Sequence, residues 1–159
     1  MRGNMSITAV RRVLQVVSVC AACAACAHEP AGPESEVTGT YGLASVDGDT
    51  LPAVLWTEGG VTLRLGTDLL IFDGRGGVTR TFTWQRDSLP VGMVESGTQT
   101  AVLQYRVRGD SVELGTFTPC PPNALCIGND VGVRAPATLV LDSRQFFGHR
   151  LVYALLGAI

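Results

Sequence analysis

Residues 78–85 read Val-Thr-Arg-Thr-Phe-Thr-Trp-Gln, and this stretch decides the fold class. Every second residue is threonine or glutamine. The row between them consists of Val78, Arg80, Phe82 and Trp84. A period of two residues is typical of a β-strand with one apolar face, and β-branched threonine suits the other face of a pleated surface. Residues 101–108 alternate in the same way, so we predict a second strand there.

Glycine and aspartate divide the chain after residue 39 into short runs of this kind. Gly109-Asp110 predicts a two-residue hairpin turn between residues 101–108 and 112–117, because glycine takes the positive φ that such turns need. The other expected strands are residues 41–46, 53–56, 61–65, 68–72, 138–141 and 146–155. No helical period persists for more than two turns.

This pattern predicts an all-β, antiparallel, up-and-down small barrel of eight or nine strands in sequential hairpins. Closing a sheet into a barrel removes the edges at which strands of other chains would pair. A two-sheet β-sandwich is the alternative, since strands alternate in both architectures.

The composition indicates one packed domain with no affinity for nucleic acid. Of the 159 residues 46% are apolar and 16% are charged, unlike a disordered chain. The sequence has no lysine, and from residue 13 onward nine arginines stand against fourteen acidic residues, a net formal charge of −5. Binding to nucleic acid needs clustered basic residues that neutralise phosphates, so we predict no such partner.

The first 25 residues are typical of an export signal. Three arginines precede residue 13, and residues 13–27 contain no charge and end in small residues. That uncharged run is shorter than the roughly 20 residues of a membrane-spanning helix. Residues 1–25 are therefore predicted to be a lipoprotein signal peptide, residues 26–38 a flexible tether rich in proline, glycine and acid, and residues 39–159 the single domain.

The cysteines suggest a lipid anchor. Cys23 and Cys26 each follow Ala-Ala, which resembles the bacterial lipobox, although cysteine stands where that motif has leucine. Lipidation of Cys26 leaves Cys120 and Cys126 to form a disulfide, whereas lipidation of Cys23 leaves an odd thiol in an oxidising compartment. We predict Cys26, with Cys23 as the alternative. Cleavage after Ala27, which would give a soluble secreted protein, is a further alternative.

No set of residues predicts catalysis, a metal site or a cofactor. The two histidines lie far apart, at positions 28 and 149. Cys120 and Cys126 supply only two of the four ligands that a zinc site needs. Ser111, His149 and Asp110 could be combined into a catalytic triad, but a chain with this many serines and aspartates always allows such a combination, and the Gly-x-Ser-x-Gly turn is missing, so we reject it. We therefore predict no enzyme, with a hydrolase of unknown site as the alternative.

Gly39-Thr40-Tyr41 opens the first expected strand, and Arg150 stands in the last. This pair resembles the lipocalin pattern, in which a Gly-x-Trp packs against an arginine of the final strand, with Tyr41 in place of tryptophan. Residues 39–52 are also similar to the opening of uncharacterised small-barrel lipoproteins of Gram-negative bacteria. The resemblance implies a barrel closed by Tyr41 and Arg150 and a location in the cell envelope facing the periplasm, and it implies no activity.

Two functions fit these features. In the first, the protein is a non-enzymatic binder of a small apolar ligand, held in a barrel lined by Phe82, Trp84, Leu103 and Tyr105. In the second, it is a structural or protein-interaction lipoprotein of the envelope with a filled core. A roomy apolar interior favours the first, and an exposed apolar patch favours the second.

Overall fold

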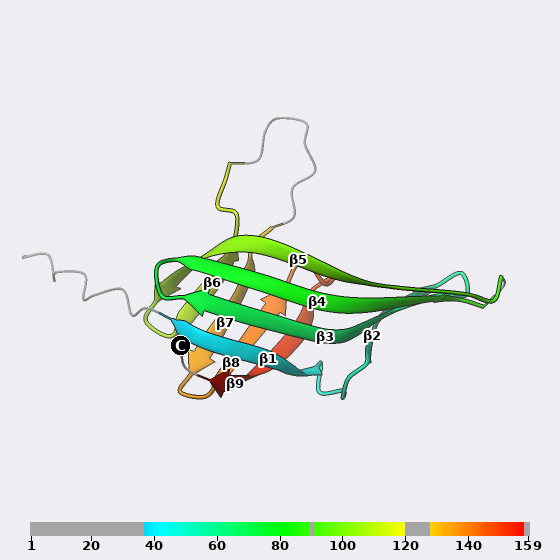
Figure 1. Ribbon diagram of the computed structural model, residues 1–159, viewed down its shortest axis with the longest axis horizontal. Coiled ribbons are helices and arrows are strands. Elements are labelled where there is room, and N and C mark those ends of the chain that lie inside the picture. Colours follow the sequence, from blue (N-terminus) through cyan, green and yellow to red (C-terminus); the bar gives the residue numbers. More distant parts are fainter. Residues whose placement is uncertain (1–36, 90, 120–127, 158–159) are drawn as a thin grey trace, which may run out of the picture. The chain divides into compact units, whose positions relative to one another are not determined.

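The computed structural model describes residues 37–89, 91–119 and 128–157 (Figure 1). These residues form nine strands: β1 (Thr38–Val46), β2 (Ala53–Glu58), β3 (Val61–Asp73), β4 (Gly77–Ser88), β5 (Met93–Arg108), β6 (Ser111–Gly115), β7 (Asp130–Ala135), β8 (Thr138–Ser143) and β9 (His149–Gly157). They make one antiparallel sheet in the order β1-β9-β8-β7-β6-β5-β4-β3-β2, in which β1 also pairs with β3. Eight strands therefore close a barrel and β2 lies outside the ring. The predicted small barrel is confirmed, and the sandwich alternative is wrong.

Strand β1 closes the ring because it is shared between two neighbours. Its residues 38–42 pair with residues 69–73 of β3, and its residues 40–46 pair with β9. Strand β2 pairs with residues 61–65 of β3, beyond the part that β1 occupies. The first and last strands are thus neighbours, as an up-and-down barrel requires.

Alternate residues of the strands fill the interior. The most deeply buried apolar side chains include Val46, Leu65, Leu70, Phe72, Val78, Val112, Leu114, Leu139, Leu141, Leu151 and Tyr153. The ring of Phe72 lies edge-on to Tyr41 and Tyr105, with centroids 5.5 and 5.0 Å away. The Tyr105 hydroxyl donates a hydrogen bond to the carbonyl of Val37, which is itself buried. The folded part thus includes Val37 and Thr38, which the sequence had assigned to the tether.

Three strands are longer than the ring needs. Strands β3, β4 and β5 have 13, 12 and 16 residues. Their far ends continue past the barrel together with β2, and the β4–β5 hairpin extends furthest (Figure 1). We call this four-stranded extension the projecting sheet; it consists of β2 with residues 61–65, 84–88 and 93–97.

The observed strands differ from the expected ones in several places. Residues 61–65 and 68–72 form a single strand, because the bulge at Gly66 bends it without ending it. Strand β7 and residues 93–100 of β5 were not expected, since polar residues and glycine hide their alternation. Strand β9 begins at His149, after a turn in which Phe147 has a positive φ of 57°.

No helix among the described residues has the length and apolarity that crossing a bilayer requires.

Candidate functional site

A charged cluster lies inside the barrel, centred on the guanidinium of Arg80. We call it the Arg80 cluster; it comprises Asp68, Arg80, Asp130, Ser143 and Tyr153. Arg80 occupies the inward row of β4 and is fully buried. Its Nε and Nη2 donate to Oδ2 of Asp68 over 2.9 and 2.5 Å, and its Nη1 donates to Oδ2 of Asp130 over 2.7 Å. The arginine thus links β3, β4 and β7 across the interior.

The remaining members donate further hydrogen bonds to the two carboxylates. The Tyr153 hydroxyl donates to Oδ2 of Asp68 over 2.7 Å, and the Ser143 hydroxyl donates to Oδ2 of Asp130 over 2.7 Å. The ring of Phe146 lies 4.5 Å from the Arg80 guanidinium carbon. Oδ1 of Asp68 is the one buried side-chain polar atom of the described part that has no partner.

Burial controls the ionisation of this cluster. It raises the pKa of Asp68, and the nearby Arg80 guanidinium only partly offsets that rise. It also raises the pKa of the Tyr153 hydroxyl well above its ordinary value. Burial alone would lower the pKa of Arg80, but the surrounding oxygens hold it above its ordinary value. The arginine therefore stays charged, and the cluster joins β3 and β4 to β7, β8 and β9.

Two of the four predicted ligand-lining residues are packed against the protein's own side chains. Phe82 is buried, and its ring meets Phe146 edge-on at 5.0 Å. Tyr105 is buried against Phe72. Both rings therefore belong to the packed core.

The other two, Trp84 and Leu103, are partly buried. The indole of Trp84 lies over Gly97, where an added Cβ would come within 3.0 Å of the ring. Leu103 lines a pocket of about 180 Å³ together with Leu114, Asp130 and Gln145, among others. The pocket is therefore bounded by one member of the Arg80 cluster, Asp130, as well as by apolar side chains.

The predicted closure pair, Tyr41 and Arg150, does not form. Tyr41 points into the core, where it packs on Phe72, whereas Arg150 is exposed. On β9 the inward row is Leu151 and Tyr153, so position 150 faces outward. An arginine and a tyrosine do meet inside the barrel, but they are Arg80 and Tyr153, with Nη2 and the hydroxyl 3.1 Å apart.

The side chain of His149, at the start of β9, contacts the loop after β1 and strand β2. Its Nδ1 lies 2.5 Å from Oδ2 of Asp47, and its Nε2 lies 2.6 Å from the carbonyl oxygen of Leu55. Both partners are acceptors, so only the protonated ring can donate to both. Partial burial would lower the pKa of His149, but these two contacts outweigh it and raise the pKa. The hydrogen bond from His149 in turn lowers the pKa of Asp47.

We expect this contact to stabilise the fold between mildly acidic and neutral pH. The raised pKa of His149 means that its contribution is complete below 6.5 and is lost as the pH rises through the folded value. The lowered pKa of Asp47 means that its contribution is complete above 3.8 and is lost on further acidification. Because the pair is partly exposed, the loss amounts to under about 1 kcal/mol.

Thermal unfolding of the protein and of His149→Gln between pH 5 and 9 measures this effect. The midpoint of the unsubstituted protein should fall across the upper part of the range more than that of the variant. Equal slopes for the two proteins would contradict the assignment.

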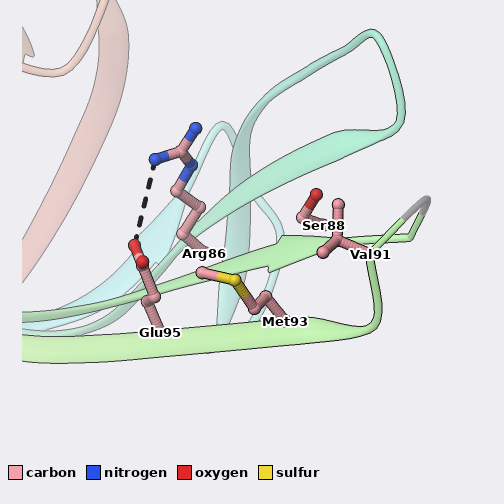
Figure 2. Close-up of a pocket in the computed structure, with 5 residues that line it drawn as sticks. All are labelled: Arg86, Ser88, Val91, Met93 and Glu95. Carbon is pink, nitrogen blue, oxygen red and sulfur yellow. Dashed lines mark ion pairs between the residues drawn. The ribbon is translucent and has the colours of Figure 1, made fainter.

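The projecting sheet ends in an exposed apolar tip. Leu89, Val91, Met93 and Val94 are exposed by 83%, 70%, 51% and 67%. Figure 2 shows a pocket of about 150 Å³ on the tip, lined by Arg86, Ser88, Val91, Met93 and Glu95. Nη1 of Arg86 lies 3.8 Å from Oε2 of Glu95, so the pocket has an ion pair on one side and apolar side chains on the other.

The cysteines predicted to carry lipid or a disulfide, Cys23, Cys26, Cys120 and Cys126, lie outside the described residues. Their roles stay predictions from the sequence.

Sequence reasoning missed the Arg80 cluster and the projecting sheet. One signal for the cluster is present in the sequence, because Arg80 lies in the otherwise apolar row of residues 78–85. A charged side chain that points into a core needs buried partners. Its partners Asp68, Asp130 and Tyr153 carry no local signal. No protein-family model, no curated protein and no solved structure matches the chain.

Proposed function

We propose that this protein is a non-enzymatic interaction protein of the bacterial cell envelope. In this proposal a lipid on Cys26 holds it at the membrane, and the projecting sheet contacts another protein. The observation that carries the proposal is the apolar tip of the β4–β5 hairpin, which presents Leu89, Val91, Met93 and Val94 to solvent.

The chemistry of the tip supports contact with a partner. Residues 88–94 contain no ionisable side chain. A partner that covers them therefore removes no charged group from water, and the desolvation cost of burying a charge does not arise. Fully burying one Val, Leu or Met side chain is worth about 1.5–3 kcal/mol, so covering the tip side chains of either face favours association. Contiguous apolar surface on a soluble domain commonly marks an interaction site.

The interior supports an interaction protein more than a carrier of an apolar ligand. Phe82 and Tyr105 are packed against protein rings, and the centre of the barrel holds the Arg80 cluster. A buried charged cluster makes an apolar ligand an unfavourable neighbour. We therefore place the interaction on the projecting sheet and not in the interior.

Site-specific photocrosslinking in intact cells tests the proposal. A photoreactive amino acid at Val91, on the tip, should form an adduct with a protein chain. The same group at Val133, an exposed position on β7, should form none and is the matched control.

Equal yields from the two positions would contradict the role of the tip. Native mass spectrometry of membrane-extracted protein provides the second readout. A stoichiometric apolar ligand that survives extraction would favour the ligand-binding alternative and overturn the proposal.

A further inference from the structure

Among the residues that the structure describes, one edge of β5 has no neighbouring strand for most of its length. Residues 93–104 pair with β4 on one side, without any shift in register. On the other side only residues 104–108 pair, with β6. Within the described part of the chain, residues 93–103 therefore have an edge with no neighbouring strand, and this edge runs from the barrel to the tip (Figure 1).

The free edge lacks most of the features by which proteins usually protect such edges. Lysine, proline, bulges and inward charges are the common devices. Residues 93–103 contain neither lysine nor proline, and their single charged residue is Glu95, which pairs with Arg86 of the same hairpin. An edge of this length offers backbone donors and acceptors that fit another strand.

We propose that the occupant of this edge is a second copy of the chain. The two β5 strands would pair antiparallel about a two-fold axis through Thr98 and join the two projecting sheets into one. This proposal rests on the proposed function and names the partner of the projecting sheet. A two-fold contact requires a surface that is complementary to itself.

The outward row of the edge is self-complementary. It consists of Val94, Ser96, Thr98, Thr100 and Val102, which has the same chemical character in both directions. Pairing every residue of the free edge places Met93 opposite Leu103 of the second copy. The same register sets Val94, exposed by 67%, opposite Val102, exposed by 80%, so each covers the other.

The inward row also fits this register. Glu95 faces Ala101 of the second copy, and Gly97 faces Gln99, so no like charges meet. Sliding one strand by two residues would place Val94 opposite Thr100 or opposite Gln104, which is already paired with Gly115 of β6. Pairing all of residues 93–103 and setting Val94 opposite Val102 therefore both favour the register centred on Thr98.

Disulfide trapping of the full-length protein in its membrane tests the register. Thr98→Cys should form a covalent dimer under mild oxidation, because the axis brings residue 98 of both copies together. Ser96→Cys and Thr100→Cys should each stay monomeric when expressed alone and should cross-link when expressed together. The unsubstituted chain gives the background from the native cysteines.

Charge substitutions test the same contact without new thiols. Val94→Glu and Val102→Lys should each raise the dissociation constant of the extracted dimer at least tenfold, as measured by analytical ultracentrifugation. The double variant should regain much of the affinity, because each pair then brings opposite charges together. Val133→Lys, on β7, should leave the dimer unchanged.

The inference is overturned if the extracted protein is monomeric, or if Thr98→Cys cross-links no better than Thr100→Cys. It is also overturned if the charge variants dimerise as the unsubstituted protein does. A monomer whose tip still cross-links to a different protein refutes the dimer and leaves the proposed function standing. A ligand-filled barrel in a dimer refutes the proposed function and leaves the dimer standing.

Discussion

Arg80→Ala is expected to lower the free energy of unfolding by about 3–5 kcal/mol, the range for breaking a buried ion pair by removing one partner. The substitution leaves the carboxylates of Asp68 and Asp130 buried without their cation. It also opens a cavity beside Phe146, whose ring lies against the guanidinium. Urea denaturation followed by circular dichroism measures the change.

Arg150→Ala is the matched control, because it removes the same side chain from an exposed position of the same barrel. Its effect should stay within about 0.5 kcal/mol. The triple variant Arg80→Met, Asp68→Asn, Asp130→Asn should be more stable than Arg80→Ala, since it removes the stranded charges along with the arginine. A loss below about 1 kcal/mol for Arg80→Ala would show that the cluster does not hold the strands together.

Cys26→Ser is expected to move the protein from the membrane fraction to the soluble fraction completely. A diacylglyceryl group adds about 0.8 kcal/mol of membrane affinity for each buried methylene, and two chains anchor a protein stably. Serine carries no thiol for the thioether. Fractionation of cells followed by immunoblotting measures the distribution.

Cys23→Ser serves as the control and should leave the protein in the membrane fraction. The reverse outcome, in which only Cys23→Ser releases the protein, would move the anchor to the alternative cysteine. Release by neither substitution would argue against a lipid on either residue.

The fold class could be predicted from sequence because two kinds of side chain alternate without interruption in residues 78–85. In a barrel strand, successive side chains point alternately to the interior and to the outer surface, which produces this period of two. Strand β7 was missed because its inward positions are Asp130, Gly132 and Arg134, which give no apolar signal. An added Cβ on Gly132 would collide with the backbone of β8, so close packing explains the glycine, and no sequence pattern reveals it.

The Arg80 cluster lay beyond prediction because its partners are remote in sequence. Asp68 is 12 residues from Arg80, Asp130 is 50 and Tyr153 is 73. Only the closed ring brings them together. The Tyr41–Arg150 pairing was wrong for a local reason, since Arg150 is out of phase with the inward residues Leu151 and Tyr153.

The shared position of β1 has a consequence for how the chain folds. Val46 of β1 pairs with Leu151 of β9, so the ring cannot close until two segments far apart in sequence meet. The entropy lost in such a loop grows with the logarithm of its length, and folds rich in distant contacts form on the scale of milliseconds to seconds. Before β9 pairs with them, β1 and β8 each have one edge whose backbone groups lack a neighbouring strand. Closure is therefore a late step in folding, and a chain cut before residue 149 would be prone to aggregate.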